Sequence, residues 1–218
     1  MPKSRRNKLI TLARTEKRVG ERKETLVTQI RESVSQFQTI YVFTTQNMRT
    51  NYLKEVRSHW AASRFFLGKN KVMQIALGRS AQEEAAENLH LLSKEVTGNC
   101  GLLFTNSSRA EVEEFFKNYT KKDFARSGSP ATETVHLSMG PLEQFSHSIE
   151  PFLRKLGMPT KLQKGVIHLE RDYTVCKEGE PLTPEQAKIL QLLGMETAEF
   201  HIELTHVWHD GKFQSLLE

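Results

Sequence analysis

The sequence has only two cysteines, Cys100 and Cys176, among its 218 residues, and they form no CxxC pair. So few thiols indicate a reducing compartment and disfavour a disulfide framework or a cysteine-rich zinc site. The chain also lacks an apolar run near the roughly 20 residues that span a bilayer, and it lacks the apolar core of a secretory signal. With 38% hydrophobic and 26% charged residues, the composition predicts a globular protein without a membrane partner.

Positive charge is concentrated in the first 23 residues. They carry nine lysines and arginines against two glutamates, a net of +7, whereas the whole chain sums to +5. A flexible basic arm over residues 1–23 is typical of proteins that add a nucleic-acid or nuclear-import tail to a fold. A solvated tail has the same composition, and the two interpretations are compatible because such arms often order only on a partner. The arm residues expected to act are Lys3, Arg5, Arg6, Lys8, Lys17, Arg18, Arg22 and Lys23.

Hydrophobic periodicity predicts helices alternating with strands in the first half of the chain. An amphipathic helix is expected from Glu24, and a buried, β-branched strand over Thr39–Thr44. Further helices are expected over 48–60, 72–77 and 81–96 and from the capping box Ser108–Glu111, and further strands over 63–67 and 101–105. This alternation predicts an α/β fold with a layered sheet.

The composition changes near Arg126, where residues 127–130 read as a linker and a proline-rich stretch begins. Expected elements of this stretch are strands over 132–137 and 161–169, a helix over 142–156, and a helix with the capping box Thr183–Gln186 that ends at Gly194. We interpret residues 126–196 as a smaller α/β domain inserted into the first one.

A last strand is expected over 200–208, followed by a hairpin turn at Asp210-Gly211. A long strand after an inserted domain suggests that the chain returns to the first sheet. We therefore expect a discontinuous layered α/β domain that comprises residues 24–125 plus 197–218.

The segment Gly68-Lys69-Asn70-Lys71 marks the point where an apolar run stops and a helical pattern begins. Gly68 lets the backbone turn without steric penalty, and the next residues lie at a helix N-terminus, which favours an anion. A P-loop needs GxxxxGK followed by Ser or Thr. Here Ser63 occupies the position of the first glycine, and Asn70 that of the hydroxyl residue. The segment therefore predicts a phosphate contact rather than nucleotide hydrolysis.

Residues that could hold a metal or carry catalysis are scattered. His201, His206 and His209 lie near the C-terminus, but strand alternation puts His201 and His206 on opposite faces. Glu111 and Glu114 fit a helix cap and a solvated face, and no set of acids suits a metal-dependent nuclease. We expect no enzyme activity, no cofactor and no metal, which leaves a nucleotide-dependent or RNA-cleaving enzyme as the least favoured class.

Binding is the function class that remains, because lysine, arginine and asparagine contact RNA phosphates without any catalytic group. The residues expected to bind RNA lie on the second helix, on the second strand and around the glycine turn: Arg49, Lys54, Arg57, Arg64, Gly68, Lys69, Asn70, Lys71 and Arg79. The charges on the second helix are equally compatible with an ordinary solvated face.

Several motifs, in one order, resemble the ribosomal stalk-base protein of archaea and eukaryotes. They are Phe-Leu-Gly-Lys-Asn-Lys-Val-Met at 66–73, Gly-Asn-Cys-Gly-Leu-Leu-Phe-Thr at 98–105, Ala-Arg-Ser-Gly at 125–128, and Leu-Gly-Met-Pro-Thr-Lys-Leu-Gln-Lys-Gly at 156–165. The similarity runs from about Lys23 to Lys212. The basic start at 2–8 and the segment 208–212 most resemble the mRNA turnover protein 4 family, the ribosome-assembly relative of that stalk protein.

The resemblance implies a discontinuous rRNA-binding domain with an insertion. It also implies a ribosome biogenesis factor that holds large-subunit rRNA at the stalk-base, GTPase-associated site of nuclear pre-60S particles until the stalk protein replaces it. Its expected neighbours are pre-60S ribosomal proteins and assembly factors. Its expected location is the nucleolus and nucleus, with shuttling to the cytoplasm left open. The alternative is a stalk-base ribosomal protein or paralogue acting in translation.

One departure from the stalk protein bears on partners. The stalk protein continues into helices that recruit acidic stalk dimers, whereas this sequence ends at Glu218, just after the expected hairpin. We therefore expect it to cap the rRNA site without recruiting those dimers. A direct role in mRNA decay, which the family name suggests, has no catalytic residues in this sequence to support it.

Overall fold

The computed structural model describes residues 19–217, which fall into two compact units that are considered separately below. The first unit comprises residues 19–43, 61–106 and 204–217, and the second comprises 44–60 and 107–203. Strands β1 (Thr39–Gln46) and β10 (Ala198–His209) contribute residues to both units. The α/β fold class is confirmed, while the expected boundaries at 126 and 196 stay a prediction. Among the described residues, no helix has the length and apolar character that crossing a membrane demands.

Helix α1 spans Val19–Gln36 and so begins before the predicted start at Glu24. Arg22 and Lys23, which we assigned to a flexible arm, are therefore helical. Glu21 in the first turn complements the positive end of the helix dipole, and Leu26 further along packs on the core, so the helix is favoured beyond its apolar stripe. The remaining arm residues lie outside the described part of the chain: Lys3, Arg5, Arg6, Lys8, Lys17 and Arg18.

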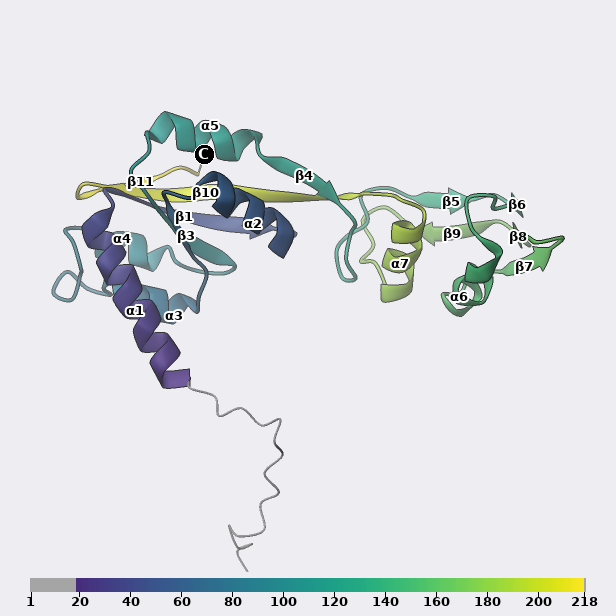
Figure 1. Ribbon diagram of the computed structural model, residues 1–218, viewed down its shortest axis with the longest axis horizontal. Coiled ribbons are helices and arrows are strands. Elements are labelled where there is room, and N and C mark those ends of the chain that lie inside the picture. The colour runs from purple at the N-terminus through teal and green to yellow at the C-terminus, as the bar shows by residue number, and fades with distance from the viewer. Residues whose placement is uncertain (1–18, 218) are drawn as a thin grey trace, which may run out of the picture. The chain divides into compact units, whose positions relative to one another are not determined.

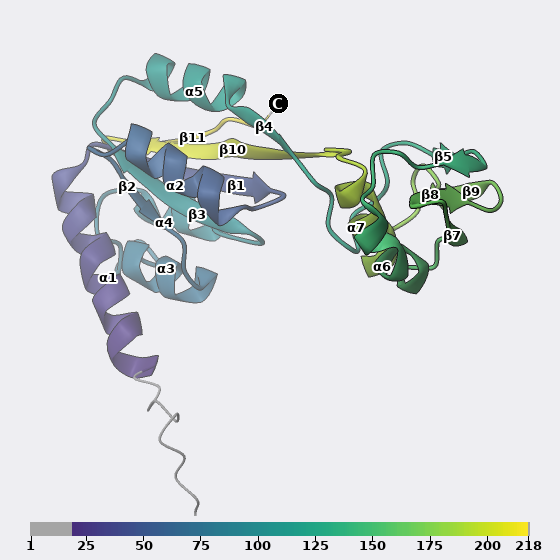
Figure 2. The ribbon, with the colours of Figure 1, turned by 45° about the vertical axis from the view of Figure 1, so that its right-hand side comes forward.

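The first unit adds β2 (Arg64–Phe66), α3 (Asn70–Leu77), α4 (Leu89–Lys94), β3 (Cys100–Thr105) and β11 (Lys212–Ser215) to α1. Within it, α1, α3 and α4 lie on the same side of the strands (Figures 1 and 2). Their apolar faces meet strand residues in one core that includes Ile30, Met73, Leu92 and Phe104. The helix predicted over 81–96 is reduced to α4, because Asn88 adopts a left-handed conformation with φ of 60°.

The main sheet has six strands in the order β11-β10-β1-β3-β2, and β4 (Thr120–Asp123) also pairs with β10. Strand β10 is antiparallel to β4 through residues 198–201 and antiparallel to β11 through residues 206–209. The turn between β10 and β11 has φ angles of 47° at Asp210 and 80° at Gly211, as a type I′ hairpin requires. The predicted hairpin is therefore confirmed.

The second unit begins with α2 (Thr50–His59) and α5 (Arg109–Asn118), and it contains β4. Its later elements are β5 (Val135–Leu137), β6 (Gly140–Pro141), a 3-10 turn η2 (His147–Ile149), α6 (Glu150–Lys155), β7 (Thr160–Gln163), β8 (Val166–Leu169), β9 (Tyr173–Cys176) and α7 (Pro184–Leu192). They form a two-stranded sheet, β5-β9, and a three-stranded sheet, β6-β8-β7. A separate core that includes Leu153, Ile167, Val175 and Ile189 holds these elements together.

Local signals explain where the second unit matches the prediction and where it differs. At α7 the capping box is complete, since the Thr183 hydroxyl accepts from the Gln186 N–H at 3.2 Å and the Gln186 side chain accepts from the Thr183 N–H at 2.8 Å. The single strand predicted over 161–169 is wrong. Lys164 and Gly165 take positive φ angles of 49° and 82°, so the chain reverses there and β7 pairs with β8.

Candidate nucleic-acid interface

The predicted phosphate contact lies at the start of α3. Lys69 is the N-cap of this helix, with φ of −72° and ψ of 126°, and no side chain caps the helix. The Lys69 carbonyl instead accepts from the N–H groups of Val72 at 2.8 Å and Met73 at 3.1 Å. An N-terminus without a side-chain cap keeps the positive end of the helix dipole open to an external anion.

Gly68 is required here for packing and not for an unusual backbone angle. It is not among the glycines with positive φ, so our interpretation of it as a conformational pivot is wrong. A Cβ added at this position would lie 2.6 Å from Cδ2 of Leu26 on α1. The absence of a side chain lets α1 pass close to the turn, and this contact fixes the turn against the core.

Asn70 holds the turn in place from within. Its side-chain amide donates to the Gly98 carbonyl at 2.8 Å, and its side-chain oxygen lies 3.6 Å from the Cys100 sulfur, a long contact with a weak donor. Burial raises the pKa of the Cys100 thiol, which favours a neutral packed group over a thiolate. We had predicted that Asn70 binds phosphate, but its amide already links α3 to the loop before β3, so we assign it a positioning role.

The other end of α3 is fixed as firmly as its start. Arg31 of α1 directs its guanidinium to the last carbonyls of the helix, with Nε 3.4 Å from the Ala76 oxygen and Nη2 3.5 Å from the Ile75 oxygen. Midway, the Gln74 amide donates to the Val96 carbonyl at 3.1 Å. Both ends and the middle of α3 are therefore tied to neighbouring elements, and the N-terminal turn is a rigid platform.

Lys69 and Lys71 are the free cations of this platform. Both side chains are exposed, and neither forms an ion pair within residues 19–217. Arg64 is exposed at the start of β2, and Arg79 is exposed just after the Gly78 C-cap. Since α3 has eight residues, Arg79 lies about 12 Å along the axis from the lysines, so it belongs to the opposite end of the helix.

The three cations predicted on α2 belong to the second unit and differ in availability. Arg49 precedes the first turn, and its Nε lies 2.5 Å from the Asp123 carboxylate while Nη2 donates to the Phe124 carbonyl at 2.7 Å. This guanidinium is committed to the end of β4. Lys54 and Arg57 are exposed and form no ion pair with any residue that the structure describes.

The C-terminal histidines contact separate partners. His201 lies 3.4 Å from the Tyr119 carbonyl, and the His209 ring lies 2.8 Å from the Thr39 hydroxyl. His206 stacks on Phe213. Within residues 19–217, no three histidine, cysteine or acidic side chains are grouped as metal ligation would need.

Sequence reasoning missed two kinds of residue. It did not foresee Arg31, whose role depends on α1 crossing the end of α3, a contact that no local pattern encodes. It also missed a row of aromatic rings on α5, although Phe115 and Tyr119 stand four residues apart, a spacing that places them on one helix face.

Two family models match the chain. The model described as "Ribosomal protein L10" matches residues 18–121, and a model described as the insertion domain of the 60S ribosomal protein of this family matches residues 125–195. The ribosome assembly factor mrt4 of Dictyostelium discoideum is 44% identical over 98% of this chain and 96% of its own length. Its namesake from Saccharomyces cerevisiae is 38% identical over 94% and 92%. The large ribosomal subunit protein uL10 of Thermococcus sibiricus is 30% identical over 66% of this chain and 43% of its own length.

Proposed function

This chain belongs to the mrt4 family of ribosome assembly factors, which are L10-type proteins that act in ribosome biogenesis, and we propose that it works by binding large-subunit rRNA at the stalk-base site of pre-60S particles. In this proposal it holds the site until the stalk protein replaces it. Its neighbours are then pre-60S ribosomal proteins and assembly factors, and its place of action is the nucleolus and nucleus.

The observation that carries the proposal is the start of α3. Two exposed lysines, Lys69 and Lys71, flank a helix N-terminus that no side chain caps. Lysine ammonium groups and helix N-termini are the groups that position phosphates in nucleic-acid complexes. We include Lys54, Arg57, Arg64 and Arg79 in the proposed interface as exposed cations. We leave out Arg49, because Asp123 already neutralises its guanidinium.

The proposed role requires binding and no chemical step. An RNA phosphate gains from Lys69, Lys71 and the helix dipole without any acid, base or nucleophile. Replacement by the stalk protein follows from sterics, because two related domains cannot occupy the same phosphate surface at once. We therefore propose a non-enzymatic factor that delays its relative by occupying the site.

A stalk-base ribosomal protein acting in translation is the second candidate, favoured by the similarity to uL10 of Thermococcus sibiricus. The two functions differ in the particle that carries the protein. We expect the tagged full chain to sediment with nuclear precursors of the large subunit and to be crosslinked there to stalk-base rRNA. Co-sedimentation with polysomes, or with acidic stalk dimers, would instead support the second candidate.

A further inference from the structure

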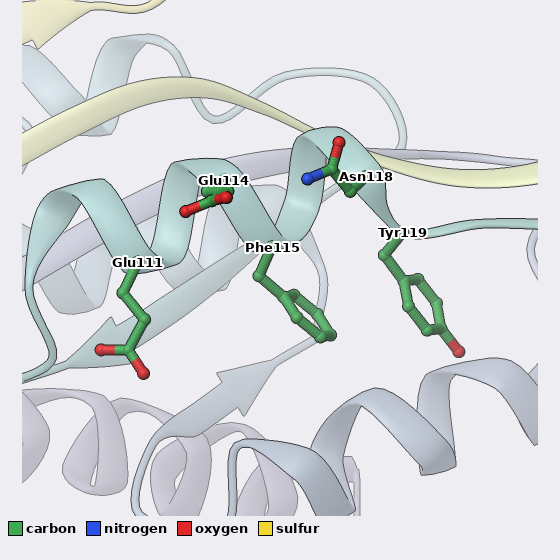
Figure 3. Close-up of a pocket in the computed structure, with 5 residues that line it drawn as sticks. All are labelled: Glu111, Glu114, Phe115, Asn118 and Tyr119. Carbon is green, nitrogen blue, oxygen red and sulfur yellow. The ribbon is translucent and has the colours of Figure 1, made fainter.

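Helix α5 carries a shallow groove along one exposed face (Figure 3). Its volume is about 520 Å³, and it is lined by Glu111, Glu114, Phe115, Asn118 and Tyr119. These positions are three or four residues apart, which places them together on one side of a helix. Figure 3 shows the side chains of Glu111, Phe115 and Tyr119 extending from α5 in the same direction.

The apolar part of the groove is a row of stacked rings. The Phe115 ring lies between His59, at 4.6 Å between centroids, and Tyr119, at 5.3 Å. The Trp60 ring meets Phe115 edge-on at 5.4 Å, and the Tyr119 hydroxyl donates to the Glu55 carboxylate at 3.2 Å. Because each ring is held by another side chain, the row is preformed and needs little ordering when a partner binds.

The polar part of the groove is acidic. Glu111 and Glu114 are exposed, and neither carboxylate forms an ion pair within the described residues. Their neighbour Glu113 differs, since it pairs with Arg109 at 2.6 Å. Two uncompensated negative charges therefore lie beside half-buried aromatic rings. Such charges repel phosphate and attract guanidinium or ammonium groups.

We propose that this groove docks a basic peptide segment of a neighbouring protein. An arginine of that segment pairs with Glu111 and Glu114, because a planar guanidinium suits both carboxylates and aromatic surfaces. A neighbouring aliphatic side chain of the segment covers Phe115 and Tyr119. This surface is a protein contact that does not depend on the rRNA contact at α3.

The test uses the full chain and a short fluorescein-labelled peptide that repeats Arg-Leu-Ser, followed by fluorescence anisotropy. We expect Glu111→Gln with Glu114→Gln to weaken binding by about tenfold, the sum of two modest charge pairs. Glu178→Gln with Glu180→Gln makes the same change in net charge at two exposed turn positions, and it should leave the affinity unchanged.

Equal affinities of the two double variants would overturn the proposal, because the peptide would then respond only to overall charge. Phe115→Leu tests the apolar part, and thermal unfolding of this variant shows whether the fold is kept. A folded Phe115→Leu protein should bind the peptide more weakly than the unmodified chain, and an unchanged affinity would remove the rings from the site. An oligouridine probe whose affinity falls only in the glutamate variant of the groove would assign the surface to RNA instead.

Discussion

Replacing Lys69 and Lys71 together by alanine tests the rRNA contact most directly. Both ammonium groups are exposed and make no ion pair with any described residue, so their removal should not disturb the fold. The groups that hold α3 in place, Asn70 and Arg31, remain unchanged. A loss of RNA affinity in this variant would therefore report on phosphate binding and not on stability.

The size of the effect follows from counterion release. Each phosphate contact contributes about 0.7 to 0.9 to the slope of log affinity against log salt, so losing two contacts should lower the slope by about 1.4 to 1.8. At about 0.15 M salt this change corresponds to roughly fifteenfold to thirtyfold weaker binding. Some affinity should remain, because the N-terminus of α3 and the other exposed cations still face the RNA.

The measurement is anisotropy of a labelled stalk-base rRNA fragment, titrated with the full chain at several salt concentrations. Lys117→Ala with Lys177→Ala is the matched control, since both residues are exposed and the change in net charge is the same. We expect this control to keep the original slope. If the slopes of the two double variants are equal, the assignment of the start of α3 as the phosphate contact is wrong.

Three further predictions concern stability and ionisation. Gly101→Ala should lower the free energy of unfolding by about 1–3 kcal/mol in urea, because the new methyl group would overlap the buried Phe43 ring. Arg49→Ala should cost about 1–2 kcal/mol, because it leaves the largely buried Asp123 carboxylate without its partner. Burial and the Glu55 carboxylate raise the pKa of Tyr119 to about 12. Its neutral phenol therefore stabilises the folded state below about pH 10, a contribution lost as the pH rises towards 12, and Tyr119→Phe should remove this dependence.

Matched variants identify the cause in each case. Gly68→Ala should cost less than Gly101→Ala, because it meets only the end of the partly exposed Leu26 side chain, which can move. Arg57→Ala should leave stability unchanged, since Arg57 is exposed and has no ion pair among the described residues. Equal costs within either pair would contradict the packing or the ion-pair argument. An ultraviolet titration of Tyr119 with a midpoint near 10 would contradict the third prediction.

Elements with strong local signals could be predicted from the sequence. The capping box at Thr183 and the turn at Asp210-Gly211 depend on residues within a few positions of one another, and both are present. The helix expected over 81–96 could not be judged in this way. Its apolar spacing is correct, but the left-handed Asn88 interrupts it, and the Asn88 amide donates to the Gly211 carbonyl, far along the chain.

The candidate site shows the same division. The position of Lys69 and Lys71 at a helix start follows from the sequence, because a glycine and a change of pattern mark it. The roles of Asn70 and Arg49 do not, since their partners Gly98 and Asp123 are brought near only by the tertiary fold. A short polar side chain in a basic segment looks like a ligand until its own hydrogen-bond partner is known.

The contact between Arg31 and the last carbonyls of α3 changes the electric field at the other end of that helix. An isolated helix is a dipole, carrying about half a positive charge at its N-terminus and half a negative charge at its C-terminus, and the two largely cancel at a distance. The Arg31 guanidinium offsets the negative pole, so the positive pole acts more like a single charge whose potential falls more slowly with distance. An approaching phosphate would therefore sense α3 from as far as salt screening allows, about 8 Å at physiological ionic strength.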